Sequence, residues 1–344
     1  MKFLIAGLGS VGRRHFRNLL ALGEKDLLLL RTGRSTLPDE ELAGFPVESD
    51  LRSALGRRPE AVIVANPTSL HLEVAIPAAR AGCHVFLEKP ISHSLQGVAD
   101  LEREAADRSL QVAVGFQFRF HPGLRKVEAL LRQEAVGLPL AARVHWGEYL
   151  PDWHPWEDFR KGYAARDDLG GGAVLTLCHP LDYLGWFFGE VEALWAFTGR
   201  RGLELPVEDE AEVGLRFRSG LLGSVHLSYN QQPAVHRLEV VGSRGTIVWD
   251  NADGAVRLAA AGPDGRVGER QIFSAPQGFE RNLLFLGEMQ DFLDAVRGKK
   301  AQPACTLADG RRALELALAA LESARSGTLQ LINKNDGAHR RGAS

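Results

Sequence analysis

The first third of the chain alternates short, continuous apolar runs with amphipathic segments. Between the runs, apolar spacings of three and four residues predict helices, among them 70–82 and 94–108. This alternation predicts an α/β domain built on a doubly wound parallel sheet of six strands with crossover helices. The apolar runs that predict its buried strands include residues 2–6, 27–30, 61–65, 85–87 and 112–116.

From Leu140 onward the hydrophobic period changes to two, as where Val144 and Trp146 alternate with His145 and Gly147. Short turns join such segments, which predicts a C-terminal α+β domain with one large, mainly antiparallel open sheet. Further strands are expected within 191–197, 211–217, 225–229, 237–241, 245–249 and 255–259, and helices over 123–134, 173–188, 280–296 and 310–326. Thr306-x-x-Asp309 resembles a capping box for the last helix.

The change of period divides the chain into residues 1–120 and 121–333, followed by a polar tail over 334–344 that we expect to be disordered. No segment is predicted to cover the outer face of the antiparallel sheet. We therefore expect a homodimer or homotetramer that buries this face.

Composition narrows the function classes. With 344 residues, 45% hydrophobic and 24% charged, the chain resembles a soluble globular enzyme. A net charge of −2 offers no electrostatic footprint for nucleic acid or an anionic membrane, and no apolar run reaches bilayer-spanning length. Cys83, Cys178 and Cys305 lie far apart without ligand-like spacing. We therefore expect no metal site, and a reducing, cytoplasmic environment.

A glycine pattern follows the first predicted strand and opens a helix. In Gly7-x-Gly9-x-x-Gly12, the first glycine permits a tight turn, the second a close phosphate, and the third close helix–strand packing. Free N–H groups at the helix start would face the phosphates. The alternative is an ordinary glycine-rich turn. The residues expected to contact a dinucleotide here are Gly7, Leu8, Gly9, Ser10, Val11 and Gly12.

The second predicted strand ends in Arg31-Thr32-Gly33-Arg34-Ser35, where an NAD site usually places an acidic residue. Arg31, Thr32 and Arg34 instead offer donors to a 2′-phosphate, unless the turn is only a solvated basic one. The pattern favours NADP(H), with NAD(H) possible.

Glu88-Lys89-Pro90 ends another predicted strand, so Lys89 is expected at the carboxyl edge of the sheet, where such sheets bind ligands. Pro90 keeps Lys89 out of the helical region, in an extended or cis-peptide geometry. A lysine held there can polarise a hydroxyl or take part in proton transfer, although it can also be an ordinary surface lysine.

Other polar residues follow neighbouring strands at the same edge. Those expected near the nicotinamide ribose are Asn66, Pro67, Thr68 and His71. Gln117, after the strand that ends at Phe116, is also expected to contact the cofactor. Arg119 and His121 leave this strand on its ligand side, as substrate contacts or as interdomain polar contacts.

Two segments of the second half stand out. The aromatic, non-periodic loop 149–163 is either a packed Ω-loop or a sugar- or base-binding loop, with Trp153, Trp156, Arg160 and Tyr163 as candidate contacts. Gly170-Gly171-Gly172 then precedes a predicted helix on which Thr176 and His179 share a face with Asp182 or Tyr183. His179 is either a satisfied core residue or a catalyst that the glycines allow a ligand to approach.

Together these residues resemble the Gfo/Idh/MocA oxidoreductase family over 2–330. The resemblance rests on the glycine fingerprint, Glu88-Lys89-Pro90, the Arg119 segment, and the glycines followed by His179 and Asp182. The loop from Tyr149 also resembles a subgroup associated with polysaccharide and nucleotide-sugar pathways. Leu175 stands where many members have an aspartate four residues before the histidine.

The resemblance implies a Rossmann domain and hydride transfer between NAD(P) and a hydroxyl or ketone of a sugar-like substrate. Lys89 would polarise the reacting oxygen, His179 would be the general acid/base, and Asp182 or Thr176 would orient its ring. Glu88 would contact the cofactor. Two alternatives remain open: an oxidoreductase acting on a non-sugar carbonyl or imine, and a non-catalytic NADP(H)-binding regulatory or structural protein.

Overall fold

The computed structural model describes residues 1–31, 33, 37, 40–262, 265–266, 268 and 270–332. Its N-terminal part is a six-stranded parallel sheet in the order β3-β2-β1-β4-β5-β6, the Rossmann topology expected from the sequence. The strands are β1 (Lys2–Ala6), β2 (Asp26–Leu30), β3 (Val47–Glu48), β4 (Ala61–Val64), β5 (His84–Leu87) and β6 (Val112–Val114).

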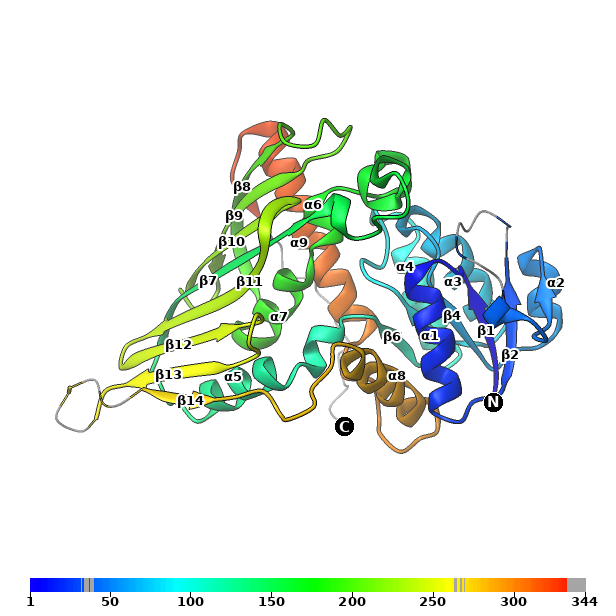
Figure 1. The fold of residues 1–344 in the computed structure, drawn as a ribbon, viewed down its shortest axis with the longest axis horizontal. Helices are drawn as coiled ribbons and strands as arrows, with labels where there is room; N and C mark the ends of the chain where they lie inside the picture. The colour runs from blue at the N-terminus through cyan, green and yellow to red at the C-terminus, as the bar shows by residue number, and fades with distance from the viewer. Residues whose placement is uncertain are drawn as a thin grey trace, which may run out of the picture.

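Helices cover both faces of this sheet (Figure 1). They are α1 (Ser10–Ala21), α2 (Leu51–Gly56), α3 (His71–Arg80) and α4 (Val98–Asp107), with short 3₁₀ turns η1 (Glu40–Leu42), η2 (Thr68–Leu70) and η3 (Gln117–Phe120). Asp50 caps α2, because its side chain accepts from the Ser53 N–H. The helix predicted from Ser94 begins later, at Val98, because Gly97 adopts a left-handed conformation (φ +82°) before it.

The second sheet has nine strands in the order β14-β13-β12-β11-β7-β10-β9-β8-β15. It is antiparallel except where β7 pairs parallel with β10. Its strands are β7 (Pro139–Tyr149), β8 (Val191–Gly199), β9 (Glu210–Phe217), β10 (Leu222–Ser228), β11 (Asn230–Gly242), β12 (Gly245–Asp250), β13 (Val256–Ala260), β14 (Gln271–Phe273) and β15 (Gln330–Leu331).

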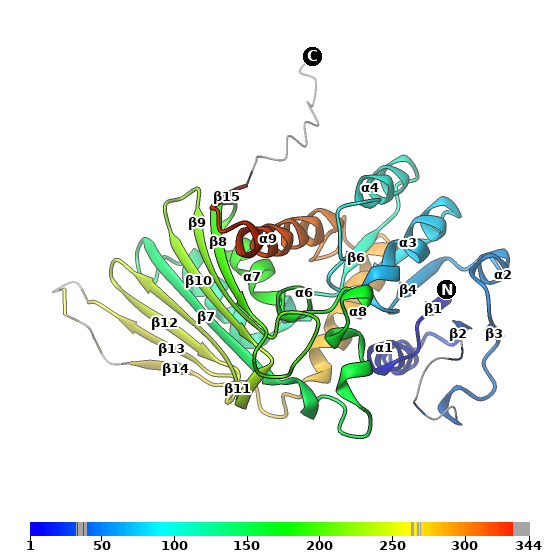
Figure 2. The same cartoon turned by 90° about the horizontal axis from the view of Figure 1, so that it is seen from above.

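Helices pack against one face of this sheet, and within the described residues no helix covers the other face (Figure 2). They are α5 (Pro122–Arg132), α6 (Ala173–Thr176), α7 (His179–Phe188) and α9 (Leu307–Ser326). The capping box of α9 is present: Thr306 Oγ1 accepts from the Asp309 N–H, and Asp309 accepts from the Thr306 N–H. Loop 149–163 and the residues after it form 3₁₀ turns η4 (Leu150–Asp152), η5 (Phe159–Lys161), η6 (Tyr163–Ala165) and η7 (Asp167–Leu169).

The chain returns to the first sheet near its end. Helix α8 (Asn282–Val296) contacts α1 and η3, and Thr306 forms an antiparallel bridge with Ala113 at the β6 edge. The division at residue 120 therefore remains a prediction, since α8 and the start of α9 are shared between the two sheets.

The helix predicted over 173–188 is wrong in one respect: it is broken at Leu177 and Cys178 into α6 and α7. Pro180 supplies the reason. In a continuous helix its backbone nitrogen would have to donate to Thr176 O, four residues earlier, and proline has no N–H. Pro180 instead lies in the first turn of α7, where no such donor is needed. The break leaves Thr176 O available to another donor.

Candidate active site

The glycine loop has the shape that a dinucleotide phosphate requires. Gly7 has φ +93°, and a Cβ on it would lie 2.5 Å from the Ala65 carbonyl carbon, while a Cβ on Gly12 would overlap Gly7 O. A Cβ on Gly9 would meet open space. Helix α1 begins just after Gly9 without a side-chain cap, so its first N–H groups face the same space. These residues fit a bound pyrophosphate.

The two neighbours of these glycines differ in exposure: Leu8 is buried in the core, while Ser10 is exposed beside the open space. Arg31 follows β2, is half-buried, and its backbone N–H donates to Glu48 O (3.0 Å). Thr32 and Arg34 lie outside the described residues.

Lys89 reaches the second domain from the carboxyl end of β5. Its Nζ donates to Thr176 O at 2.7 Å, and the Lys89–Pro90 peptide is cis, one of the two geometries expected. The broken helix therefore supplies the acceptor for the Lys89 ammonium. Thr176 contributes through its carbonyl, and its buried hydroxyl has no hydrogen-bond partner among the described residues.

Glu88, expected to contact the cofactor, is instead buried beneath the Lys89 turn. Its Oε1 lies 2.7 Å from His15 Nε2, and its Oε2 accepts from the Lys89 N–H at 3.2 Å. A Cβ on Gly115 would come within 3.2 Å of the Glu88 carboxyl group, so the fit there is tight. Burial favours the neutral acid, but the contact with His15 and the charge of Lys89 lower the pKa of Glu88 overall. His15 was not anticipated, although it lies three residues after Gly12.

His179 is the first residue of α7 and is 1% exposed. Its ring lies among Phe116, Phe118 and Trp146, with centroid distances of 5.3, 4.9 and 5.4 Å. Burial, then the positive charge of Lys89, lowers its pKa well below the usual value, so the ring is neutral at neutral pH. Its Nδ1 has no hydrogen-bond partner in the described part of the chain.

The expected orienting role of Asp182 is wrong. Its carboxylate is occupied by Arg119, whose Nε and Nη2 donate to it at 2.9 and 2.6 Å, while Arg119 Nη1 donates to Ala304 O at 2.7 Å. Burial lowers the pKa of Arg119, but the charge of Asp182, its hydrogen bonds with Arg119 and the charge of Asp309 together contribute to a pKa that is raised overall. Arg119 therefore makes a polar contact that joins η3 to α7, and its role as a substrate contact stays a prediction. Nor does the Thr176 side chain bond to His179.

The residues expected near the nicotinamide ribose include a structural one. His71 lies between two backbone carbonyls, with Nδ1 2.9 Å from Pro90 O and Nε2 2.9 Å from Asn66 O. It therefore supports the two turns rather than facing a ligand. Asn66 donates to Leu70 O at 3.0 Å, and its buried Oδ1 has no partner among the described residues. Thr68 and Gln117 are buried, and Pro67 precedes η2.

Loop 149–163 mixes packing residues with exposed ones. Trp153 packs edge-on against Tyr229, with centroids 5.8 Å apart, whereas Trp156 is 62% exposed. Arg160 is exposed and stacks over Phe159, with its Cζ 4.5 Å from the ring centroid. Tyr163 is 37% exposed, yet the atoms around its phenol raise its pKa and the positive charge of Lys89 opposes that rise, which puts it on the Lys89 side of the loop.

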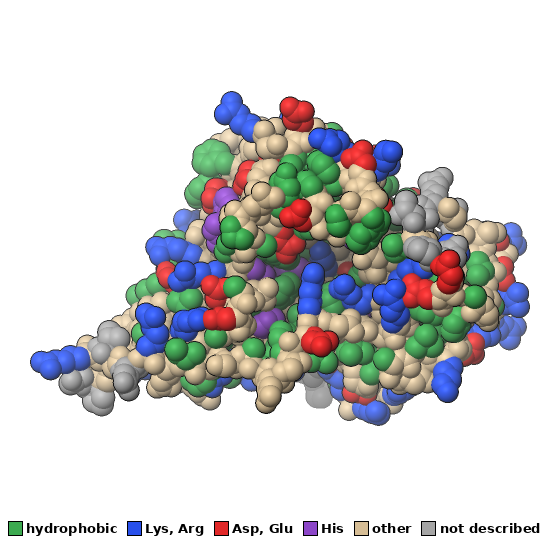
Figure 3. Space-filling view, in the orientation of Figure 1, with side chains coloured by type: hydrophobic (Ala, Val, Ile, Leu, Met, Phe, Trp, Pro, Cys, Tyr) green, Lys and Arg blue, Asp and Glu red, His purple; other side chains and the backbone are tan. Residues whose placement is uncertain are grey.

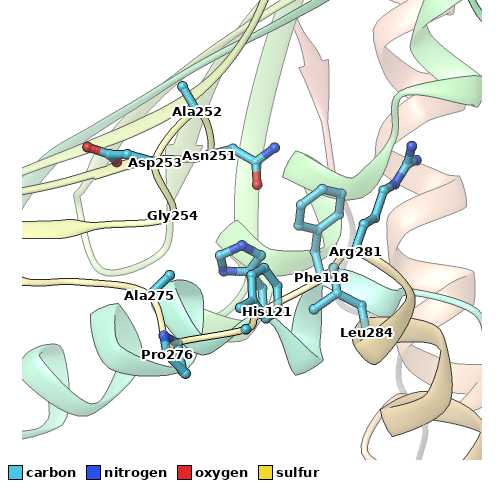
Figure 4. A pocket seen from close by; sticks show the side chains of 12 residues that line it. Phe118, His121, Asn251, Ala252, Asp253, Gly254, Ala275, Pro276, Arg281 and Leu284 are labelled. Atoms are coloured by element: carbon cyan, nitrogen blue, oxygen red, sulfur yellow. The ribbon is translucent and has the colours of Figure 1, made fainter.

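A cavity of about 410 Å³ opens next to η3, lined by Phe118, His121, Asn251 and Arg281 among others. Figure 4 shows Asn251 and Arg281 reaching toward it from the end of β12 and the start of α8. Phe118, which lines the cavity, has its ring centroid 4.9 Å from that of His179, so this ring connects the cavity with the imidazole. In Figure 3 histidine and basic side chains gather in the hollow between the two domains. The sequence interpretation missed Asn251 and Arg281, which carry no motif.

Two family profiles match the chain. Residues 1–116 match the profile described as oxidoreductase family, NAD-binding Rossmann fold, and residues 124–248 match the GFO/IDH/MocA C-terminal domain. The chain belongs to the Gfo/Idh/MocA family. It is thus an oxidoreductase with an NAD-binding Rossmann domain, as the fingerprint at Gly7 predicts.

Curated members of the Gfo/Idh/MocA family include two that resemble this chain over most of its length. The myo-inositol 2-dehydrogenase of Thermotoga maritima is 29% identical over 338 residues, covering 94% of this chain and 96% of that one. The 1,5-anhydro-D-fructose reductase of Ensifer adhaerens is 27% identical over 300 residues, covering 86% and 83%.

Solved structures of this Gfo/Idh/MocA fold superpose closely. Levoglucosan dehydrogenase in complex with NADH and levoglucosan has a TM-score of 0.84 at 21% identity, covering 97% of this chain and 100% of that one. The WlbA dehydrogenase from Bordetella pertussis, in complex with NADH and UDP-GlcNAcA, has a TM-score of 0.79 at 22% identity, covering 97% and 99%. At these identities the likeness shows a shared fold.

Proposed function

We propose that this protein transfers a hydride between a nicotinamide cofactor and a hydroxyl or ketone carbon of a sugar or polyol. The observation that carries the proposal is the approach of Lys89 from the first domain to Thr176 O, three residues before His179 in the second. This contact would bring two groups suited to handling a proton to the same substrate. The names of relatives, which act on inositol and anhydro sugars, support this substrate class.

The cofactor supplies the redox chemistry when bound; the glycine loop and the start of α1 would hold its pyrophosphate. Asn66 Oδ1, buried and without a partner among the described residues, offers an acceptor near the nicotinamide end. Lys89, with three donors and one bond to Thr176 O, keeps donors for the reacting oxygen of the substrate.

His179 is assigned the proton transfer. Because its ring is neutral, it can accept the proton of a substrate hydroxyl during oxidation, and return it in the reverse direction. The unpartnered Nδ1 means that no carboxylate in the described structure fixes its tautomer. Aromatic rings on three sides fix the orientation of the imidazole instead.

The cavity beside His179 is proposed as the substrate chamber. Arg281 and Asn251 would recognise an anionic or hydroxylated part of the substrate, and Tyr163 would close the chamber from the loop side. Trp156 and Arg160, both exposed, would meet a larger substituent such as a linked nucleotide.

We also propose a preference for NADP(H), supported by Arg31 at the end of β2 and by the lack of an acidic residue in 31–35. Charge-assisted bonds to a 2′-phosphate would favour NADP(H) by about 1–3 kcal/mol. Isothermal titration with both cofactors tests this preference, and equal or tighter NAD(H) binding contradicts it.

The uncovered face of the second sheet supports a homo-oligomer, dimer or tetramer. Trp195 and Phe197 on β8 are 44% and 69% exposed there, with ring centroids 5.1 Å apart.

A cytoplasmic location is proposed from the three free, buried cysteines. Within the described residues, no helix has the length and apolar character needed to cross a membrane.

The direct experiment is a screen for nicotinamide reduction, with NADP⁺ and NAD⁺, against free polyols, anhydro sugars and nucleotide-linked uronic sugars. The proposal expects absorbance change with at least one of these classes. Turnover confined to imines or non-sugar carbonyls would contradict the proposed substrate class and favour the alternative oxidoreductase. Cofactor binding without turnover on any compound would favour a regulatory role.

A further inference from the structure

Behind the Lys89 turn, three buried side chains converge from distant parts of the sequence. They are His15 on α1, Glu88 after β5 and Glu288 on α8, with exposures of 0%, 6% and 3%. One nitrogen or oxygen atom of each lies within 4.8 Å of those of the other two. No other role described above uses Glu288.

Hydrogen bonds account for Glu88 but not for Glu288. Glu88 has His15 Nε2 on one oxygen and the Lys89 N–H on the other. Neither oxygen of Glu288, nor Nδ1 of His15, has a hydrogen-bond partner among the described residues. An ionised carboxylate buried in this way, without donors, is strongly disfavoured.

The charges around Glu288 do not compensate. Glu88 and Asp291 are negative and disfavour a second carboxylate, whereas Arg14 and Lys89 are positive and favour one. Burial and the Glu88 charge prevail, and they raise the pKa of Glu288 well above its usual value.

The Arg14 guanidinium stacks over the ring of Phe285, with its Cζ 4.3 Å from the centroid, and its ion pair with Glu288 is not among the contacts of the described residues. Burial, then the charge of Arg281, lowers the pKa of Arg14. His15 Nδ1, in the tautomer that donates from Nε2 to Glu88, is an acceptor without a donor. The cluster therefore lacks one proton donor.

We infer that Glu288 is a neutral carboxylic acid at neutral pH, held within 4.8 Å of the His15–Glu88 pair, so that it adds no second carboxylate charge there. The cluster then carries one carboxylate charge directly behind Lys89 instead of two. Glu288 is thus a positioning residue that acts through Glu88 on the Lys89 turn. The inference rests on the proposed function only in the role given to Lys89.

The Glu288→Gln substitution tests this protonation, because glutamine is a neutral donor of nearly the same shape that does not titrate. The unfolding constant of each protein is measured by chemical denaturation between pH 4 and pH 9. In the wild type, the unfolded chain releases the Glu288 proton above its ordinary pKa of 4.5 while the folded chain retains it. Stability is therefore lost as pH rises from 4.5 to the folded pKa, and the variant is spared this loss.

The expected result is a stability advantage of Glu288→Gln that grows with pH by up to about tenfold in the unfolding constant per pH unit, then levels off. Glu280→Gln is the matched control, because Glu280 is exposed near the start of the same helix and should show no such trend. A stability difference between variant and wild type that stays constant from pH 4 to pH 9 would show that Glu288 is ionised in the folded protein, and would overturn the inference.

A second measurement does not depend on how the variant folds. In infrared difference spectra recorded across the same pH range, the wild-type protein should keep the C=O band of a buried protonated carboxylic acid at neutral pH. Absence of this band contradicts the inference.

Elemental analysis of the purified protein tests the competing interpretation of the cluster, a bound cation. Stoichiometric zinc or manganese that depends on Glu288 would mean a bridging cation instead of a proton. Neither measurement requires a substrate, so its failure is distinct from failure of the hydride-transfer proposal.

Discussion

Lys89 Nζ donates a 2.7 Å hydrogen bond to the Thr176 carbonyl oxygen, which Pro180, four residues later, leaves without a helical donor. The bond joins the carboxyl edge of the first sheet to the start of the helix that carries His179. A helix defect in one domain thus fixes the position of a cationic side chain from the other. The lysine and the histidine are consequently coupled electrostatically, since the charge of Lys89 lowers the pKa of His179.

The first prediction concerns this coupling. Replacing Lys89 with methionine removes a positive charge beside His179, so the pKa of His179 should rise toward its ordinary value of 6.5. NMR titration of the His179 ring protons, assigned with His179→Gln, measures the change. An unchanged His179 titration in Lys89→Met would show that burial alone sets its protonation.

The second prediction concerns the buried pair of Arg119 and Asp182. Asp182→Asn removes the nearest carboxylate and leaves the buried Arg119 guanidinium with the Ala304 carbonyl and with Asp309, 3.3 Å from Nη2. We expect a loss of about 3 kcal/mol in the free energy of unfolding, measured with urea. Asp100→Asn, which breaks an exposed pair with Arg103, is the control and should leave stability unchanged. A loss no larger than that of the control contradicts the structural role.

The third prediction is a pH dependence set by His121. Its Nδ1 accepts from the Gly123 N–H and caps α5, and burial lowers its pKa to about 4. Because the folded pKa lies below the unfolded value of 6.5, stability is lost as pH falls from 6.5 to about 4, on the order of 3 kcal/mol. His121→Asn keeps a capping acceptor, but its stability should not fall in this pH range on account of residue 121. Parallel pH–stability curves for the two proteins would refute it.

The fourth prediction tests the assembly. Introducing a charge by Phe197→Glu should dissociate the oligomer if the aromatic patch on β8 is its interface. Light scattering at micromolar concentration measures the mass. Ile272→Glu, at the opposite edge of the sheet and 59% exposed, is the control and should leave the mass unchanged. A wild-type monomer excludes this interface.

Much of the architecture follows from local pattern. The continuous apolar strands and the glycine turn at Gly7 predict the parallel sheet, because each feature has a single low-energy arrangement there. The capping box at Thr306 and the cap at Asp50 are local too, and both are present. The parallel pairing of β7 with β10 is not predictable in this way, because residues far apart in sequence determine it.

The site was predicted less well, for reasons that particular residues make clear. Lys89 and Thr176 are brought together, but through a backbone carbonyl that only the position of Pro180 would have revealed. Arg119 and Asp182 bond to each other across 63 residues, and a sequence gives no measure of that separation in space. Asn251 and Arg281 reach the cavity from a turn and a helix start without any motif.

The account depends most on Lys89 and His179 acting on one substrate oxygen. Its most direct test is steady-state turnover of Lys89→Ala, His179→Ala and the double variant on a substrate found by the screen, alongside cofactor affinity by titration. Asp100→Asn, an exposed change on α4, is the control and should leave turnover unchanged. We predict that each single variant lowers kcat by roughly 10²–10⁴-fold with cofactor affinity nearly unchanged, and that the double variant falls well short of the product of the two losses. Undiminished turnover in His179→Ala, or fully multiplicative losses, would contradict it.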